Sequence, residues 1–477
     1  MCGDVTWNED DNSLKSMRPH SFVCGSGTVA DGRQVMVGGD DFTHRAGHSE
    51  GSATLLMGLF RKQSECEARS RVLRKPMVRL LDGSSGGGSV ATVLELGYNY
   101  VPPLLGFEHK VKMLAEVPVA TALLGPVVGF GAARAVTSHY SVMCSKVSSL
   151  FVAGPPVVAA LGENVTKEEL GGAQVHGANG SVDDVVGSET EAIGCIHRFL
   201  SFLPSSAWEL PPVIPTTDSP DRREVALDSL IPRHRKAVFD IRQLIRLVID
   251  NDTPFFEMGR GWGSSLVTGF ARFEGRSVGI LASDSAKSGG ALTSDAARKL
   301  ARFVRLCDTF HLPVVSFVDQ PGFAVGVQAE EEGTIRAGAA AIAALYSLRS
   351  GYFAVIIRRA YGVGGAMLVD CGKGHDAGIN WRIAWPSAET GSLPLDGGVV
   401  AAFKSQIESA QDPAKALEEL TRRIDNLRSP LRTAAAFSVE DIIKPRDTRP
   451  YLCRWVRDMY AKKSHGDTLG PREGYVP

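Results

Sequence analysis

The sequence predicts an α/β fold made of two duplicated domains, and three observations support this prediction. A stretch in the first half of the chain recurs in the second half, β-branched runs alternate with helical spacing, and a proline-rich stretch separates the two copies. With 477 residues, the chain is long enough for each copy to bury its own hydrophobic core. We therefore expect two similar domains, each assembled from repeated strand–strand–helix (ββα) units.

The internal repeat is ungapped over its first stretch and then continues at slightly smaller spacing. Gly32-Arg33 pairs with Gly275-Arg276, and equivalent residues there are 243 positions apart (275 − 32 = 243). Two later matches have offsets of 237 (319 − 82 = 237) and 233 (362 − 129 = 233), namely Asp82 with Asp319 and Gly129 with Gly362. A falling offset is what shorter loops in the second copy produce, so the repeat predicts two domains of one architecture.

The alternation of strand and helix signals is clearest in the middle of the second copy. Residues 314–318 form a mostly β-branched run, which predicts a buried strand. Before it, apolar residues recur at helical spacing from Ser294 to Leu312, and Ser294 can serve as the N-cap of this amphipathic helix.

Changes in composition divide the chain into five segments. We expect an N-terminal tail over residues 1–20, a first domain over 21–203, a linker with a connecting helix over 204–250, a second domain over 251–449 and a C-terminal tail over 450–477. The linker holds five prolines between residues 204 and 220, and proline interrupts helices and central strands. We expect proteases to cut this linker first.

Charge and cysteine usage exclude several classes of function. The 52 Lys and Arg residues balance 53 Asp and Glu residues, so no basic field is available for nucleic acid or for a membrane surface. The N-terminal stretch lacks the apolar segment of a signal peptide, and no apolar run reaches bilayer length, so we expect a cytoplasmic protein. The eight cysteines are scattered without metal-ligand spacing, and we expect no metal site.

Several motifs, in their order along the chain, resemble the carboxyltransferase β-subunits of acetyl-CoA and propionyl-CoA carboxylases. The likeness extends from about Ser21 to about Arg449, and its motifs are GTVADGR, DDFTHRAG, GPVVGFGAA, LFVAGPPVV, ENVTKEELGGAQVH, ARFVRLCDTFHLPVVSFVDQPGF, RRAYGVGGA and AWPSAE. A single glycine motif is weak evidence, whereas a whole series in one family's order is specific. The resemblance implies an enzyme with two crotonase-like (ClpP-like) domains related by duplication.

The first glycine turn has the features of an anion site for an acyl-CoA. Removing a proton from the α-carbon of a CoA thioester places negative charge on the thioester oxygen, which preorganised N–H donors stabilise. Gly129, Phe130 and Gly131 offer such amides where a strand gives way to a helix, and Ala132 follows them. By resemblance, this turn is the oxyanion hole for the acyl-CoA enolate, with Ala132 on the substrate side.

The duplicate turn would, by resemblance, face the ureido oxygen of carboxybiotin. Negative charge develops there as the carboxylate leaves the ring nitrogen, and Gly362, Val363, Gly364 and Gly365 would bind it. The family usually has two adjacent glycines in each turn, whereas Phe130 and Val363 stand at the second position here. A positive φ would not suit valine. Each turn, taken alone, is also compatible with a simple strand-to-helix crossover.

Two loops at strand ends complete the site that the resemblance implies. Ser85, Gly86 and Gly87 follow a strand and resemble the family's serine–glycine–glycine loop near the CoA arm. Gly322 and Phe323 match the family's proline–glycine–phenylalanine loop, which helps to shape the biotin pocket.

We assign structural roles to the histidines and aspartates of the matched segments. No Ser/His/Asp order, HExxH pair or GxSxG elbow accompanies them, and a duplicated aspartate after a strand usually holds a turn. In the implied reaction the biotin ring can itself accept the α-proton, so an acid–base signature is not required. The residues are His44, His48, His139, His176, Asp41, Asp82, Asp284 and Asp319.

The resemblance also implies cofactors and partners. Because the chain has no Ala-Met-Lys-Met type biotinylation site and no GxxxxGK[ST] loop, biotin carboxylase and the biotin carrier are expected on other subunits. We expect a homo-oligomer, a hexamer by resemblance, in which the first domain of one protomer and the second domain of another share each site. Two alternatives stay open: biotin-independent decarboxylation or other enolate chemistry on a CoA-type thioester, and a non-catalytic subunit of a carboxylase complex.

Overall fold

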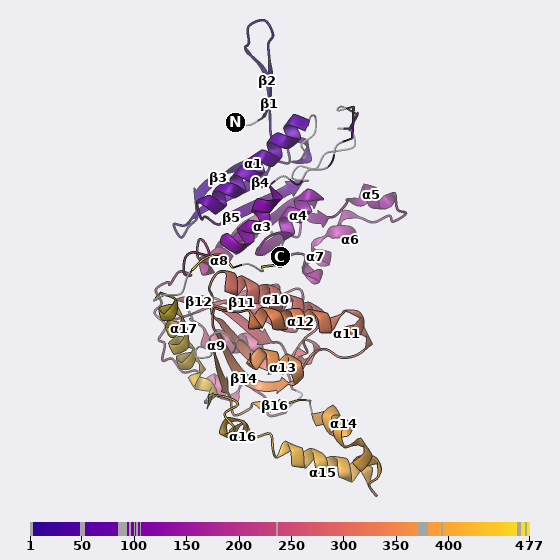
Figure 1. The fold of residues 1–477 in the computed structure, drawn as a ribbon, viewed down its shortest axis with the longest axis vertical. Coiled ribbons are helices and arrows are strands. Elements are labelled where there is room, and N and C mark those ends of the chain that lie inside the picture. Colours follow the sequence, from indigo (N-terminus) through magenta and orange to yellow (C-terminus); the bar gives the residue numbers. More distant parts are fainter. Residues whose placement is uncertain are drawn as a thin grey trace. The chain divides into compact units, whose positions relative to one another are not determined.

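The computed structural model describes residues 3–47, 53–83, 93–94, 97–99, 101, 104, 106–234, 237–370, 380–392, 395–464, 469–472 and 475–477. The chain divides into two compact units (Figure 1). The first comprises Met1–Pro211 with Leu469–Pro477, and the second comprises Pro212–Thr468. Each unit has its own mixed sheet and its own helices, so the predicted duplication is visible in the architecture.

The first unit contains a seven-stranded sheet among the described residues. Its strand order is β3-β4-β5-β6-β7-β9, with β8 beside β6; β3 and β4 are antiparallel, and the later strands pair parallel. The strands are β3 (Phe22–Thr28), β4 (Gln34–Asp40), β5 (Met77–Gly83), β6 (Val119–Val128), β7 (Tyr140–Cys144), β8 (Ser149–Phe151) and β9 (Asp184–Val186). The helices are η1 (Arg45–Gly47), α1 (Ala53–Val72), α3 (Phe107–Glu116), α4 (Phe130–Val136), α5 (Pro155–Ala159), α6 (Lys167–Gly171), α7 (Ala173–Asn179) and α8 (Glu189–Phe202).

The second unit repeats this sheet with one additional strand at its edge. In the described part of the unit the sheet has eight strands in the order β10-β11-β12-β13-β14-β15-β17, with β16 beside β14. The strands are β10 (Phe256–Met258), β11 (Leu266–Phe273), β12 (Arg276–Ser283), β13 (Val314–Gln320), β14 (Tyr352–Tyr361), β15 (Trp381–Ala384), β16 (Glu389–Gly391) and β17 (Asp441–Ile442).

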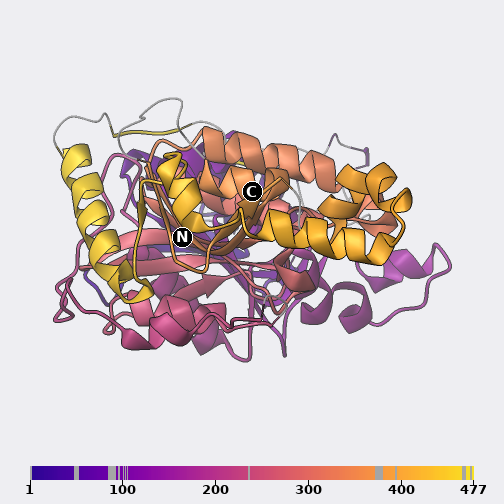
Figure 2. The same ribbon diagram turned by 90° about the horizontal axis from the view of Figure 1, so that it is seen from below.

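The helices of the second unit lie on its sheet and beyond its edge. Helix α10 packs against α12, while α14 and α15 lie side by side (Figures 1 and 2). The helices are η2 (Val225–Ser229), α9 (Ile241–Val248), η3 (Ser288–Gly290), α10 (Ser294–Thr309), α11 (Val327–Glu331), α12 (Thr334–Tyr346), α13 (Gly362–Val369), α14 (Leu395–Glu408), α15 (Pro413–Asp425), α16 (Pro430–Ala435), η4 (Pro445–Asp447) and α17 (Thr448–Ser464).

The two sheets share an irregularity at the same place. Between β5 and β6 the register shifts just before Gly83, which pairs with Val127; between β13 and β14 it shifts just before Gln320, which pairs with Ala360. These pairs are related by the offsets of the sequence repeat, 237 (320 − 83 = 237) and 233 (360 − 127 = 233). A bulge re-aims the backbone that follows it, so both units direct a strand end and the next turn in the same way.

Apolar burial explains why these sequences form these layers. In β13 every residue is buried, as expected for a parallel strand that is covered on both faces. Helix α9 turns its apolar stripe, Ile241, Leu244, Ile245 and Val248, into the main core of the second unit. Helix α10 begins as predicted, but its N-cap is Thr293, whose hydroxyl accepts from the Ala296 N–H, rather than Ser294.

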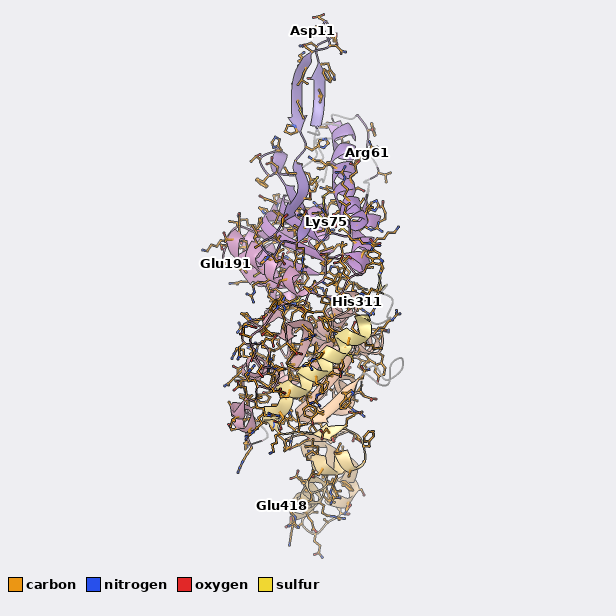
Figure 3. All side chains as sticks on the ribbon, turned by 90° about the vertical axis from the view of Figure 1, so that its left-hand side faces the viewer. Asp11, Arg61, Lys75, Glu191, His311 and Glu418 are labelled. Atoms are coloured by element: carbon orange, nitrogen blue, oxygen red, sulfur yellow. The ribbon has the colours of Figure 1, made fainter. Side chains whose placement is uncertain are left out.

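The ends of the chain are more structured than tails. Residues 3–19 form an antiparallel hairpin of β1 (Gly3–Trp7) and β2 (Leu14–Pro19), with Asp11 at its tip (Figure 3). Helix α17 contributes Leu452, Trp455 and Val456 to the main core of the second unit, so the body of that unit continues past residue 449. Near the C-terminus, the Tyr475 hydroxyl lies 3.3 Å from the Ser138 carbonyl oxygen in the first unit.

From Pro212 onward, the proline-rich segment is bound within the second unit. The Ile214 N–H donates to the Gly275 carbonyl, and Arg222 donates to the Asp218 carboxylate and to two carbonyl oxygens. Arg449 donates to the Ser219 carbonyl. Hydrogen bonds hold the backbone of this segment in place, which lowers its exposure to proteases. The early cleavage expected from the sequence is therefore disfavoured here.

Candidate active site

The first glycine turn lies at the junction of β6 and α4. Gly129 has φ 59° and ψ −115°, a conformation that favours glycine, and its N–H donates to the Phe151 carbonyl at 3.0 Å. Helix α4 then begins at Phe130, and the Ala133 N–H donates back to the Gly129 carbonyl at 3.1 Å. The first N–H groups of a helix have no carbonyl partner within it, so the amides of Phe130, Gly131 and Ala132 can bind an external anion.

The second glycine turn lies at the equivalent junction of β14 and α13. Gly362 has φ 58°, nearly the value of Gly129, and it directly follows the last residue of β14. The side chain of Val363 is 59% exposed, while Gly364 and Gly365 are buried. The N–H groups of Val363, Gly364 and Gly365 are therefore the counterparts of those of Phe130, Gly131 and Ala132 in the first turn, 233 positions apart (363 − 130 = 233).

The conformations remove the difficulty raised by Phe130 and Val363. Positive φ falls on Gly129 and Gly362, whereas Phe130 and Val363 lie inside helices, which any L-residue accommodates. Substitution of the family's second glycine therefore preserves the backbone amide and adds a side chain beside it.

The structure brings the second turn into contact with the proline–glycine–phenylalanine loop. A Cβ on Gly364 would lie 3.0 Å from the Gly322 carbonyl carbon and 3.1 Å from the Phe323 nitrogen, so a larger residue there requires the loop backbone to shift by a few tenths of an ångström. The side-chain Oε1 of Gln320 accepts from the Gly322 N–H at 3.0 Å and orients the loop. Of the loops predicted from the sequence, the one containing Ser85, Gly86 and Gly87 lies outside the described residues.

The aspartates before the two loops have opposite electrostatic surroundings. Asp319 is buried and accepts paired hydrogen bonds from both Arg358 and Arg359 at 2.7–3.0 Å. Burial alone would raise the pKa of Asp319, yet the hydrogen bonds from Arg359 and Arg358 hold it below its usual range. Burial raises the pKa of Asp82, and the negative charges of Asp40 and Glu189 raise it further.

The other duplicated aspartates hold turns, as predicted. The Asp41 carboxylate accepts from the Thr43 N–H at 3.0 Å, and the Asp284 carboxylate accepts from the Ala286 N–H at 3.0 Å. Asp284 also forms an ion pair with Arg242 at 2.7 Å.

The described histidines of the matched segments have structural partners. His139 is buried; its Nδ1 accepts from the Val119 N–H, and its Nε2 lies 2.9 Å from the Leu114 carbonyl oxygen. The Nε2 of His176 lies 2.7 Å from the Leu150 carbonyl oxygen, and His44 pairs with Asp41 at 2.8 Å. His48 lies outside the described residues. These contacts agree with the structural roles that the sequence predicts.

A buried ionic cluster lies next to the first turn and was not predicted from the sequence. It contains Asp40, Glu67, Arg79, Lys110 and Arg134, all of them buried side chains. One signal could have revealed it: Lys110 recurs at helical spacing with Met113 and Leu114, on the buried face of α3. A lysine on such a face needs a buried counter-ion.

In the described part of the chain, no helix combines the length and the hydrophobicity that a membrane span requires. Within the same residues, no group of three or more His, Cys, Asp or Glu side chains is placed to hold a metal ion.

A duplicated α/β fold with a glycine turn at the same strand-to-helix junction of each unit defines a crotonase-like double-domain enzyme. The chain matches the carboxyl transferase domain family over residues 8–468. It is 32% identical to the propionyl-CoA carboxylase carboxyltransferase subunit of Haloferax mediterranei, and the alignment covers 97% of this chain and 90% of the relative. The methylmalonyl-CoA decarboxylase subunit alpha of Veillonella parvula is 31% identical, with 95% and 86% covered.

A solved structure shows the same architecture. The crystal structure of the hexameric transcarboxylase 12S, with hydrolysed methylmalonyl-coenzyme A bound, superposes with a TM-score of 0.80 at 30% identity, covering 94% of this chain and 85% of that one. This chain therefore belongs to the carboxyl transferase family, as the motifs predicted. It is an enzyme, and it is of the same type as the carboxyltransferase subunits of acyl-CoA carboxylases.

Proposed function

We propose that this enzyme transfers the carboxyl group of carboxybiotin to the α-carbon of an acyl-CoA thioester, using backbone amides to bind the two anions that develop. The observation that carries the proposal is the recurrence of one glycine turn, with φ 59° at Gly129 and φ 58° at Gly362, after equivalent strands of the two units. One anion develops on the thioester oxygen and the other on the ureido oxygen, so a reaction with two anions accounts for two turns.

The first turn would bind the acyl-CoA enolate. Its N–H groups are fixed by the helix that follows, so they need no reorganisation when the charge appears on the thioester oxygen. The amides of Phe130, Gly131 and Ala132 would share this charge, and the exposed Gly129 leaves room for the thioester to approach.

The second turn has features that suit biotin. The amides at the start of α13 provide donors for one oxygen, and the exposed side chains of Val325 and Val363 provide apolar contacts for a ring. Gly364 and Gly322 hold the turn and its neighbouring loop close together. Carboxybiotin would supply the carboxyl group and, once that group has left, a basic ring nitrogen that can accept the α-proton.

A side-chain base is not needed in this scheme. The side chains of His139 and His176 contact backbone groups. Among the described histidines, His139 is the closest in sequence to the first turn, and His176 is the closest to β9. The protein's part is therefore to orient the two substrates, exclude water and stabilise both oxyanions.

We propose that the protein works as a homo-oligomer that shares its sites between protomers. Apolar side chains near the second turn are exposed in the single chain, and others are exposed in the first unit beyond β8. These residues are Val325, Val327, Ile335 and Val363 in the second unit, and Val152, Val157 and Leu161 in the first. The hexamer assembly of transcarboxylase 12S supports a hexamer here. Biotin carboxylase and the biotin carrier would be separate subunits.

A second candidate function is decarboxylation of a carboxylated CoA thioester. It is favoured by the relatives that are named methylmalonyl-CoA decarboxylase subunit alpha, in Veillonella parvula and Propionigenium modestum, each 31% identical to this chain. The reaction would use the same enolate turn, since loss of a carboxyl group also leaves negative charge on the thioester oxygen.

The experiment that tests the proposal offers the purified chain a panel of acyl-CoAs with carboxylated free biotin. We expect a carboxylated acyl-CoA to form, and its formation to stop when carboxylated biotin is omitted. Conversion of a malonyl-type thioester without any biotin would instead establish biotin-independent decarboxylation. Failure of both reactions in the folded oligomer would contradict the proposal and favour a non-catalytic subunit.

A further inference from the structure

A buried ionic cluster joins five elements of the first unit. Glu67 on α1 lies 3.1 Å from an Nη of Arg79 on β5 and 2.8 Å from the Nζ of Lys110 on α3. Arg134 on α4 lies 3.4 Å from Asp40 at the end of β4. The side chains of all five residues are at most 1% exposed. Taking charges out of water is costly, so a cluster of this size requires a compensating role or a precise set of partners.

The five described residues of the cluster carry more positive than negative charge. Its ion pairs unite three cations with two carboxylates, a surplus of one positive charge (3 − 2 = 1). Burial would raise the pKa of Glu67, but the charges of Arg79, Lys110 and Arg134 lower it, so Glu67 is ionised. Burial lowers the pKa of Lys110, and the ionised Glu67 opposes that effect.

The cations of the cluster contact both ends of α4. Arg79 donates to the carbonyl oxygens of Arg134 and Thr137 at 2.9 and 2.6 Å, where the helix dipole favours a cation. Lys110 is at the other end: its Nζ lies 5.6 Å from the ring centroid of Phe130, the first residue of α4. A cation near a helix N-terminus adds to the positive potential there, so it favours the binding of an anion at that end.

We propose that Lys110, held against Phe130 by Glu67, is a positioning residue that increases the affinity of the first turn's amides for an oxyanion. The inference rests on the proposed function of that turn. A unit charge roughly 8 Å from an oxyanion, at an effective dielectric constant of about 20, changes an ionisation constant by on the order of one pKa unit. The ammonium lies 5.6 Å from the Phe130 ring centroid and 5.9 Å from the Phe107 ring centroid, so two aromatic rings flank it.

The test uses a CoA thioether that carries a nitroethyl group in place of the acyl group. When its α-carbon loses a proton to solvent, the nitronate that forms carries negative charge on oxygens that stand in for the thioester oxygen. The bound nitronate is followed by its near-ultraviolet absorbance as a function of pH. We expect the wild-type protein to lower the apparent pKa of the bound compound relative to the free compound.

The variants separate an electrostatic role from a purely structural one. Lys110→Met should raise the apparent pKa of the bound nitro compound by about one unit, a tenfold change. Glu67→Gln should also raise it, because Lys110 loses the counter-ion that keeps its ammonium charged and in place. The double variant should fall close to Lys110→Met, because both single changes remove the effect of the same ammonium. Lys110→Arg, which retains the positive charge, should stay close to the wild-type value. Lys112→Met, a change at an exposed lysine of the same helix, should leave the apparent pKa unchanged because solvent screens that charge.

Circular dichroism and thermal unfolding check that each variant is folded. If Lys110→Met does not fold, Glu67→Gln and Lys110→Arg still give the sign and the recovery. Shifts in opposite directions for Lys110→Met and Glu67→Gln, no shift in either, or a Lys110→Arg value equal to that of Lys110→Met would overturn the inference while the wild-type shift upholds the proposed function. If the wild-type protein forms no nitronate, the proposed function of the first turn fails and this inference fails with it.

Discussion

Asp82 and Asp319 occupy equivalent positions in the two units, but their surroundings have opposite electrostatic character. Asp319 accepts paired hydrogen bonds from two arginines of β14, which lower its pKa. The pKa of Asp82 is raised by burial and by two nearby carboxylates. In the first unit, the cations Arg79, Lys110 and Arg134 lie instead in the buried ionic cluster beside α4. The duplication has therefore kept the backbone of the turn while the charges that support it have been redistributed.

This comparison shows which features the fold imposes and which are free to change. The bulge, the positive φ of the turn glycine and the helix that follows recur in both units. These are backbone features, and the proposed chemistry depends on backbone amides. The side chains beneath the turns differ, which allows each unit to bind a different anion.

The largest effect on stability is expected for Asp319→Asn. It leaves Arg358 and Arg359 without their buried counter-ion, and removal of one partner of such a pair costs about 3–5 kcal/mol. Because the folded pKa of Asp319 is lowered, its contribution is present above the unfolded value of about 3.9 and is lost as the pH falls through the folded value. Urea unfolding at pH 7 and pH 3 measures both effects. Equal stability of variant and wild type at pH 7 would contradict this role.

Alanine substitution of two glycines at equivalent turns should reduce stability by different amounts, because the packing around the two glycines differs. Gly32 and Gly275 have φ 83° and 74°, so alanine at either position is strained by about 1–2 kcal/mol. A Cβ on Gly275 would also lie 1.8 Å from the Ile214 carbonyl oxygen, whereas no atom lies within 4 Å of a Cβ on Gly32. Overpacking adds about 1–3 kcal/mol. Thermal unfolding should therefore rank Gly275→Ala as clearly less stable than Gly32→Ala, and a reversed order would refute the bound position of the proline-rich segment.

Asp82→Asn should have the opposite sign to Asp319→Asn. A carboxyl whose folded pKa is raised contributes stability below the unfolded pKa of about 3.9, and this contribution is lost as the pH rises through the folded value. At pH 7 the variant removes repulsion from Asp40 and Glu189, so we expect it to unfold at a slightly higher urea concentration than the wild type. This gain should disappear near pH 3. A destabilised variant at pH 7 would show that Asp82 has a favourable partner.

The smallest effect on catalysis is expected for His176→Ala. This side chain contacts the Leu150 carbonyl rather than either turn, and its removal should change turnover by less than about tenfold. Steady-state rates of the folded variant provide the measurement. A loss of a hundredfold or more would instead identify His176 as an acid or base.

The features that could be predicted from the sequence are those that depend on local sequence patterns. The repeat fixed by Gly32, Gly129 and their partners predicted the double domain, and the glycine motifs predicted where each turn lies. The structural roles of His139 and Asp284 also followed from the absence of a catalytic motif around them.

Features that depend on contacts distant in sequence could not be predicted. Prolines between 204 and 220 suggested an open linker, but Arg449 and Gly275 bind this segment from far along the chain. In the same way, the Arg79–Glu67–Lys110 cluster brings together residues from three elements, and no local pattern reveals their pairing. In a sequence, charged residues that form buried ion pairs cannot be distinguished from charged surface residues, because only the fold shows that the two charges are in contact.

The central claim is that equivalent amides in the two turns bind different anions, and the pair Phe130→Pro and Val363→Pro tests it most directly. Both residues lie in the first turn of a helix, where proline is tolerated, so each change chiefly deletes one N–H. Phe130→Ala and Val363→Ala retain the N–H and serve as matched controls.

Two partial reactions are compared for each variant: deuterium exchange at the α-carbon of an acyl-CoA without biotin, and carboxyl release from carboxylated free biotin without acyl-CoA. Loss of one oxyanion donor typically costs about a hundred- to a thousandfold in rate. We expect Phe130→Pro to lose exchange but retain carboxyl release, and Val363→Pro to show the reverse. If each proline variant loses both reactions equally, or if the alanine controls lose as much as the proline variants, the assignment of separate anions to the two turns is contradicted.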